Sequence, residues 1–506
     1  MKTRFAHLMI LILFSLIPEL GWGGELQLHP AFSSNMVLQR EMPVNLFGSG
    51  KPGTTVSVTF AGQSRKTKVD EKGKWKVTLA PLKASSTPAV LIVKSGSDRL
   101  ECQNVLVGDV WFCSGQSNMA RPFSAFSQLK GTLNTLVKPL LRLYRTANVT
   151  ATTPQDLPLI PTKKGQEGAN TWQLCDTSAL IKFSPIAYYF SAKVSDELQI
   201  PVGVFLSSWG ATSAEAWTPQ ETLNSLNLGY TIRFAPDSWN QPSICYNSLI
   251  HPFLQMTFKG FLWYQGESNS QWAGQYKILF PAMILEWRKR FHAEDRPFYF
   301  VQIAPYNRIQ WDISGEAWAW LRDSQTQTLK LVPKTGMTVL TDLGEFEDIH
   351  PQCKKEAGER LALFALRDAG KRLEPVSPMF KSFQIEGNRC KIEFDHAGSG
   401  LETRRVVMNK MKDQPIQKDP QAFVVEAGQL KGFTISGPDR KFVEANAAIV
   451  GGHVEVWNDA ISSPVAVRYG WTNFPLCNLF SKAGLPVNPF RTDNFPIPIL
   501  KEEKKQ

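Results

Sequence analysis

The sequence is poor in the residues that bind metal ions. It contains seven histidines and seven cysteines among 506 residues, and both are dispersed along the chain. No two cysteines are separated by two residues, and no His-Glu-x-x-His segment occurs. Because zinc sites usually show one of these spacings, the sequence predicts no metal centre. The odd cysteine count means that at least one thiol is free or pairs with another chain.

Long apolar runs and basic stripes are also missing. Residues 8–17 form one short, mainly apolar run, which follows Lys and Arg residues and precedes Gly21-Trp-Gly-Gly24. This pattern is typical of a signal peptide, and the run is shorter than the ~20 residues that span a bilayer. We therefore expect a signal peptide at 1–24, a mature chain without a membrane span, and a secreted or periplasmic location. The net charge of +11 is scattered, which argues against a nucleic-acid partner.

The hydrophobic pattern changes twice along the chain. Residues 25–105 alternate apolar and polar residues between turn signals, which predicts an Ig-like β-sandwich. Residues 106–372 alternate short apolar runs with helical patterns, which predicts an α/β domain with a mainly parallel sheet. A helix is expected after His350, with Pro351 in its first turn and Gly370 near its end. Residues 373–506 return to short strands and predict a second β-rich domain. The strands expected in the central domain are Val110–Cys113, Val202–Ser207, Gly260–Tyr264, Phe298–Ile303 and Met337–Leu340.

The Gly-x-Ser-x-Gly elbow of the α/β-hydrolases is absent. Polar clusters instead follow four of the expected strands. In α/β sheets ligands bind beyond the carboxyl ends of the strands, so these clusters are expected to share one site. They are Ser114-Gly-Gln-Ser-Asn118, Ser208-Trp-Gly-Ala-Thr-Ser213, Gln265-Gly-Glu-Ser-Asn269 and the segment from Thr341 to His350.

Together the clusters contain the groups that acyl transfer requires. Ser114 or Ser117 is a candidate nucleophile, and a serine hydroxyl needs a base within hydrogen-bond reach. His350 is the candidate base, because it stands at a loop-to-helix junction just after several acids. The Gly210 backbone N–H and the Asn269 amide are suited to binding a tetrahedral oxyanion. These residue types alone do not choose between the two serines.

Four segments resemble the sialate O-acetylesterases, within the SGNH hydrolase superfamily. They are GDVWFCSGQSNM (108–119), SSWGATSAEAW (207–217), WYQGESN (263–269) and DIHPQCKKEAGERLALFAL (348–366). Flanking phrases such as NMVLQREMPV (35–44) and AGLPVNPFRTD (483–493) extend the resemblance over nearly the whole chain after residue 24. The resemblance implies a three-layer αβα catalytic domain, with Ser117 as nucleophile and His350 as base. It also implies an oxyanion hole made by the backbone N–H of Ser117, by Gly210 and by Asn269.

The sequence departs from the family pattern at two positions. Ala211 stands where many relatives have a second glycine, and Glu347 stands three residues before His350, where relatives commonly have aspartate. The resemblance therefore assigns Glu347 as the acid that orients the histidine, with Asp348 or a Ser-His dyad as alternatives. Gln116, Arg322 and Gln325 are expected to contact the substrate, with a purely structural role as an equal alternative for Arg322 and Gln325.

The resemblance implies an exported carbohydrate esterase that removes O-acetyl groups from sialic acid. The reaction would pass through an acetyl-serine and would need no cofactor. An acetyl xylan esterase or another acetyl-sugar esterase is the nearest alternative, because the motifs do not define the sugar. A carbohydrate-binding protein without activity is the alternative of another class. The sequence predicts an O-acetylated glycan as partner and no particular oligomeric state.

Overall fold

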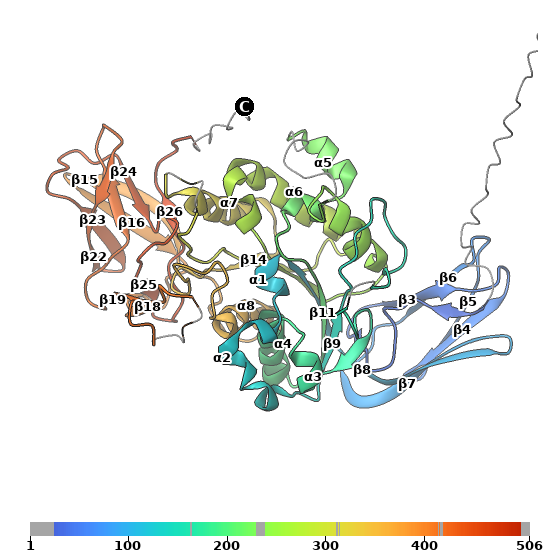
Figure 1. The fold of residues 1–506 in the computed structure, drawn as a ribbon. Helices are drawn as coiled ribbons and strands as arrows, with labels where there is room; N and C mark the ends of the chain where they lie inside the picture. The colour runs from blue at the N-terminus through green and yellow to red at the C-terminus, as the bar shows by residue number, and fades with distance from the viewer. Residues whose placement is uncertain are drawn as a thin grey trace, which may run out of the picture.

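The computed structural model describes residues 25–161, 164–228, 238–309, 312, 314–412, 414 and 418–496. The expected signal peptide at 1–24 lies outside the described residues. Within them the chain forms a central α/β domain, with β-rich regions at opposite ends of it (Figure 1). The α/β fold with flanking β-rich regions, expected from the sequence, is confirmed.

The central sheet contains seven strands in the order β10-β9-β11-β8-β12-β13-β14. Neighbouring strands from β9 to β14 pair in parallel, and β10 pairs antiparallel with β9 at one edge. In chain order the strands are β8 (Asp98–Gly115), β9 (Leu141–Arg145), β10 (Trp172–Leu174), β11 (Val202–Ser208), β12 (Gly260–Tyr264), β13 (Phe298–Val301) and β14 (Thr335–Thr338).

Both faces of this sheet are buried, which explains why its strands are continuous apolar runs. Successive side chains of a strand point to opposite faces. Val110 and Phe112 therefore belong to one hydrophobic core, and Trp111 and Cys113 belong to another. The helices α6 (Ala273–Arg290) and α7 (Ala317–Leu331) contribute to the first core. The helices α4 (Pro185–Leu198) and α8 (Lys354–Asp368) contribute to the second, on the other side of the sheet (Figure 1).

The helix expected directly after His350 begins later than predicted. Helix α8 starts at Lys354, so Pro351 lies outside it and not in its first turn. The intervening backbone is held by other bonds, among them the Gln352 N–H, which donates to Glu345 Oε1 at 2.8 Å. At the other end Gly370 has a φ of 93° and donates its N–H to a carbonyl of the last helical turn, as expected for a helix-ending glycine.

The N-terminal region is built on two groups of strands, which pair antiparallel except that Val37–Gln39 pairs in parallel with β8. Strand β8 passes from this region into the central sheet without interruption, across the boundary expected at residue 105. The shared strand joins the two regions without a linker. The other strands of the region are β1 (Gln27–Leu28), β2 (Val37–Gln39), β3 (Val44–Ser49), β4 (Thr55–Phe60), β5 (Gln63–Lys68), β6 (Lys74–Leu79) and β7 (Ser85–Ser95).

The C-terminal region contains two four-stranded antiparallel sheets around a separate apolar core. The first has the order β15-β16-β23-β22, and the second has the order β21-β20-β24-β26. Their strands are β15 (Met379–Glu386), β16 (Arg389–Asp395), β20 (Phe433–Ser436), β21 (Phe442–Glu444), β22 (Asn446–Val450), β23 (His453–Trp457), β24 (Ala466–Tyr469) and β26 (Phe490–Arg491). Two short pairs complete the region: β17 (Leu401–Thr403) with β25 (Leu479–Ser481), and β18 (Val406–Met408) with β19 (Phe423–Val425).

None of the helices in the described part of the chain is long and apolar enough to cross a bilayer.

Candidate functional site

Three strands of the sheet end side by side at its carboxyl edge. Ser208 of β11 and Tyr264 of β12 both pair with Gly115, the last residue of β8. Gly115 has a φ of 135°, and a Cβ there would lie 2.2 Å from the Tyr264 carbonyl oxygen. Only glycine fits so close to a neighbouring backbone. The chain can therefore turn sharply after Gly115 and place the next residues above the sheet edge.

Ser117 begins the short helix α1 (Ser117–Ala120) and is partly exposed. Its Oγ lies 2.9 Å from His350 Nε2, within hydrogen-bond distance. Ser114 lies in β8 with none of its surface exposed. The fold therefore separates the two serines, since only Ser117 reaches both solvent and a histidine.

The acid beside His350 is Asp348 and not Glu347, which corrects the prediction from the sequence. Asp348 Oδ1 lies 3.2 Å from His350 Nδ1 and also accepts the His350 backbone N–H at 2.9 Å. Glu347 instead forms an ion pair with Arg308, at 3.1 Å between Oε1 and Nη2. The hydrogen bond from the His350 N–H to Asp348 closes a tight turn. This turn places the Asp348 carboxylate beside the imidazole ring. The Glu347 side chain, three residues before His350, contacts Arg308 instead.

The surroundings of His350 favour its neutral form. Burial lowers the pKa of His350, and the positive charges of Arg121 and Lys354 lower it further, while the Asp348 carboxylate acts in the opposite sense. Burial alone would raise the pKa of Asp348, but the hydrogen bonds from His350 and the nearby charges of His350 and Lys412 together lower that pKa. A neutral imidazole can accept a proton from Ser117, and an ionised Asp348 can stabilise the imidazolium that results.

A second polar network lies directly behind this pair. Asn118, which follows Ser117, donates through Nδ2 to Glu267 Oε1 at 2.5 Å and to the Ile349 carbonyl at 3.0 Å. Its Oδ1 accepts from Lys354 Nζ at 2.6 Å. Asn118 and Lys354 are each only 2% exposed. The network therefore holds the residue after Ser117 against the residue before His350.

The sequence reasoning did not assign a role to Asn118 or Lys354. A signal for Lys354 was present, because it shares one helical face with Ala357, Gly358 and Leu361, at i+3, i+4 and i+7. A lysine on the apolar face of an amphipathic helix is buried only with polar partners. Burial lowers the pKa of Lys354 to about 8, although Glu267 and Glu345 favour its charged form.

The acid limb of the pH profile tests this electrostatic arrangement. His350 must be neutral to act as base, so activity is lost as pH falls through its pKa. A lowered pKa moves that loss below the usual histidine range near 6.5. Replacing Lys354 with methionine removes a positive charge that is present at these pH values. We expect the acid limb of kcat/KM for p-nitrophenyl acetate to move up by about half a pH unit. An acid limb that stays in place would contradict a role of Lys354 in setting the His350 pKa.

Gly210 lies against the candidate nucleophile. A Cβ at Gly210 would lie 3.4 Å from Ser117 Cβ and 4.0 Å from Ser117 N. The Trp209 N–H donates to the Gly115 carbonyl at 3.0 Å, which ties this loop to the end of β8. Ala211, the departure from the family pattern, has a φ of 59°. The backbone of this loop is therefore close enough to Ser117 to face a common reacting atom.

Asn269 is buried and held by several partners. Its Oδ1 accepts from the Ala214 N–H at 2.9 Å and from Gln265 Nε2 at 2.6 Å, and its Nδ2 donates to Glu215 Oε2 at 2.8 Å. The bond to Glu215 uses one of the two Nδ2 hydrogens. The structure therefore places Asn269 at the carboxyl edge, and its oxyanion role stays a prediction.

The three residues expected to contact substrate are structural ties in this fold. Gln116 is 3% exposed, and its Oε1 accepts from the N–H of Ser268 at 3.2 Å. Gln325 and Arg322 have no exposed surface. Gln325 accepts from the Ile303 N–H at 3.0 Å and donates to the Gln265 carbonyl at 3.1 Å. Arg322 and Gln325 have no exposed surface and bond into the fold, so they do not face the site, which corrects that expectation, and contact of Gln116 with substrate stays a prediction.

Arg322 joins the central domain to the C-terminal region. It donates to the carbonyls of Ile303, Thr472 and Asn473, at 3.2, 2.9 and 2.7 Å. Replacing Arg322 with methionine leaves these buried carbonyls without their donor. We expect the free energy of unfolding to fall by about 3 kcal/mol, measured by urea denaturation. An unchanged midpoint and slope would contradict this assignment.

Other groups that could form a site were considered. Among the described residues no group of three or more His, Cys, Asp or Glu side chains is arranged to hold a metal ion. The seven cysteines, all of them in the described part, form no disulfide. Burial raises the pKa of Cys113 and Cys353, which disfavours the reactive thiolate form.

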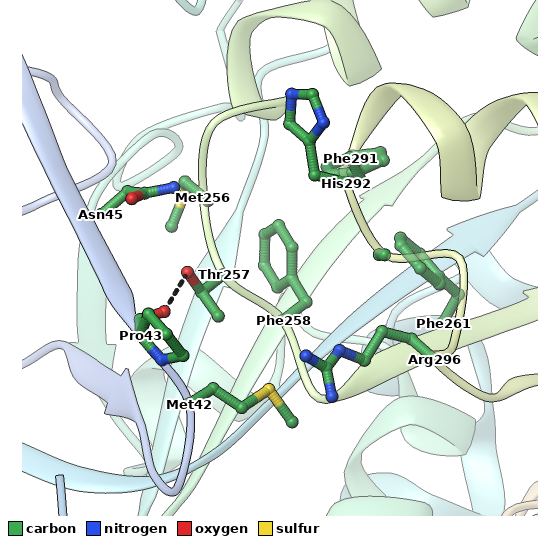
Figure 2. Close-up of a pocket in the computed structure, with 11 residues that line it drawn as sticks. Met42, Pro43, Asn45, Met256, Thr257, Phe258, Phe261, Phe291, His292 and Arg296 are labelled. Carbon is green, nitrogen blue, oxygen red and sulfur yellow. Dashed lines mark hydrogen bonds between the residues drawn. The ribbon is translucent and has the colours of Figure 1, made fainter. Parts of the chain in front are cut away.

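A cavity of about 220 Å³ lies between the N-terminal strands and the central domain. Thr257 Oγ1 donates to the Pro43 carbonyl across this boundary at 3.0 Å, and Arg296 lies at the other side (Figure 2). The wall includes Phe261, near the amino end of β12. Ser117 follows the carboxyl end of the neighbouring strand, so this cavity is separate from the Ser117–His350 pair.

Comparisons with known proteins identify the family. The family model described as carbohydrate esterase, sialic acid-specific acetylesterase, matches residues 107–367, which is more than half of the chain. The chain is 29% identical to the sialate O-acetylesterase of Homo sapiens, over 90% of this chain and 91% of that protein. It is 28% identical to the sialate O-acetylesterase of Rattus norvegicus, over 97% and 98% of the two chains.

A solved structure is similar over most of the chain. A carbohydrate acetylesterase from Xanthomonas citri is 32% identical to this chain and superposes with a TM-score of 0.81. The match covers 93% of this chain and 100% of that structure. The family model, the full-length relatives and this structure agree on one class of enzyme. The chain belongs to the sialic acid-specific acetylesterase family of carbohydrate esterases, and it is a carboxylic ester hydrolase.

Proposed function

We propose that this enzyme hydrolyses O-acetyl esters of sialic acid through an acetyl-Ser117 intermediate. The observation that carries the proposal is the pair formed by Ser117 Oγ and His350 Nε2, 2.9 Å apart, with Asp348 on the other ring nitrogen. The substrate is inferred from the relatives, because those from Homo sapiens and Rattus norvegicus are sialate O-acetylesterases.

The reaction consists of two transfers of the acetyl group. Ser117 Oγ attacks the acetyl carbonyl while His350 Nε2 accepts its proton, and the carbonyl becomes a tetrahedral oxyanion. When the oxyanion collapses, the bond to the sugar oxygen breaks and His350 donates the proton to that oxygen. A water molecule then loses a proton to His350 and attacks the acetyl-serine, and when this second oxyanion collapses the bond to Ser117 Oγ breaks. His350 returns the proton to Oγ, so acetate leaves and both residues are restored. Asp348 stays ionised and stabilises the imidazolium in both halves.

The oxyanion requires donors that are already in place. We assign this role to the backbone N–H groups of Ser117 and Gly210 and to the Asn269 amide. The contact of Gly210 with Ser117 supports the first two, and the buried position of Asn269 at the same sheet edge supports the third. None of these steps needs a metal ion or an organic cofactor.

The finer architecture and the location belong to the same proposal. We assign residues 106–372 to an SGNH-type three-layer αβα catalytic domain, 25–105 to an Ig-like domain and 373–506 to a β-rich domain. The parallel pairings of the sheet and its two cores support the first assignment. A signal peptide at 1–24 would place the enzyme outside the cell or in the periplasm.

A substrate panel tests the proposed function. Acetate release is measured from O-acetylated sialic acid, from acetylated xylan and from a neutral acetylated sugar, with Ser117→Ala as the control for background hydrolysis. We expect sialic acid to give the highest kcat/KM. Preference for xylan would overturn the assigned substrate. Absence of release above the Ser117→Ala background on every sugar would favour a binding protein over an enzyme.

A further inference from the structure

A groove adjoins the catalytic pair on the side of the Gln265–Asn269 loop. It has a volume of about 380 Å³ and is wide open to solvent. Its walls combine aromatic rings, one cation, the Glu267 carboxylate and two aliphatic residues. The side chains that matter here are Trp272, Tyr306, Arg308, Ile309, Trp318 and Ile349.

The groove is linked to the Ser117–His350 pair through two of its lining residues. Ile349 lines it and directly precedes His350, and the Ile349 carbonyl is held by Asn118, the residue after Ser117. Glu267 also lines the groove and accepts from Asn118 at 2.5 Å. This adjacency brings the groove within reach of a sugar whose acetyl group is at Ser117.

Aromatic surfaces form the floor. Tyr306 is partly exposed and packs against the buried Trp318, with ring centroids 5.7 Å apart. Trp318 is fixed in turn by a bond from its Nε1 to the Ala304 carbonyl at 3.0 Å. Such rings suit the C–H faces of a sugar, because they add apolar area at little cost in conformational entropy.

Arg308 supplies a positive charge at the rim. Its side chain is 63% exposed, and its contact with Glu347 uses the terminal nitrogen Nη2. The Tyr306 hydroxyl donates to the Arg308 carbonyl at 3.0 Å, which holds the backbone at this position. The rest of the guanidinium fork is available to solvent, and its planar geometry matches a carboxylate.

We propose that this groove is the subsite for the sugar and that Arg308 binds the carboxylate of an anionic sugar there. The inference rests on the proposed function for its substrate, and it adds the residues that select a charged sugar over a neutral one. Glu347 holds the guanidinium at the rim in the empty enzyme and competes with the incoming carboxylate.

Direct binding tests the subsite without requiring catalysis. N-acetylneuraminate and its neutral methyl ester are titrated calorimetrically into the intact chain and into Arg308→Gln. We expect the acid to bind roughly tenfold more weakly to Arg308→Gln, and the methyl ester to bind equally weakly to both proteins. The matched control is Arg389→Gln, which removes an arginine from a 3.1 Å surface ion pair with Glu455 in the C-terminal region. The control should bind the acid like the unmodified chain.

Kinetics separate this inference from the proposed function. On O-acetylated sialic acid Arg308→Gln should raise KM about tenfold with little change in kcat, and Arg308→Lys should recover part of that loss. Equal binding of acid and methyl ester by the unmodified chain, or full binding of the acid by Arg308→Gln, would overturn the subsite. Charge-selective binding without acetate release from any sugar would instead overturn the proposed function and leave the subsite in place.

Discussion

Replacing Ser117 with alanine is expected to lower kcat for p-nitrophenyl acetate by about four to six orders of magnitude. The variant retains the surrounding fold but lacks the oxygen that would form the acetyl-enzyme. The residual rate should no longer show the acid limb of His350, because the imidazole then has no serine proton to accept.

Ser114→Ala is the matched control for this loss. Ser114 lies three residues earlier, inside β8, and has no exposed surface. Its activity should stay within about twofold of the unmodified enzyme. If Ser114→Ala and Ser117→Ala lost activity equally, the effect would come from disturbing the end of β8 and not from removing a nucleophile.

Replacing Asp348 with asparagine is expected to lower kcat by about 10⁴-fold. The amide keeps the size of the side chain, but it no longer stabilises the imidazolium and permits the wrong imidazole tautomer. The pKa of His350 should also fall, because the carboxylate is the group that raises it. The acid limb of the remaining activity should therefore lie at lower pH.

Glu347→Gln is the matched control for Asp348→Asn, because it replaces a carboxylate by an amide at the adjacent position. Glu347 pairs with Arg308 and not with the imidazole, so we expect most of the activity on p-nitrophenyl acetate to remain. A larger loss in Glu347→Gln than in Asp348→Asn would return the orienting role to Glu347. Activity near that of the unmodified enzyme in both variants would indicate a Ser-His dyad.

The strands were the most predictable part of this fold. Gly260–Tyr264 has the same bounds in the sequence analysis and in the structure, because a short apolar run buried on both faces ends where polar residues begin. The strand expected at Met337–Leu340 begins earlier, at Thr335, and ends at Thr338. The hydrogen-bonded pairing with β13 sets these two ends. Hydrophobicity along the sequence does not indicate which residues pair, so the ends could not be predicted from it.

The acid of the site was not predictable in the same way. Glu347 and Asp348 are adjacent carboxylates, and only the backbone turn at His350 decides which one lies under the ring. Arg322 illustrates a second limit. A polar residue on an amphipathic helix gives the same pattern whether it faces a substrate or, as here, the carbonyls of a distant segment. Both outcomes depend on contacts between residues far apart in the sequence or on local backbone geometry.

The most direct test of the account is covalent trapping of the nucleophile. A p-nitrophenyl phosphonate mimics the tetrahedral intermediate and reacts with an activated serine. We expect one phosphonyl group on the peptide that contains Ser117, in proportion to the activity lost, and almost none in His350→Ala, as read by peptide mass spectrometry. Full inactivation with the label on another residue, or activity that survives complete labelling of Ser117, would contradict the account.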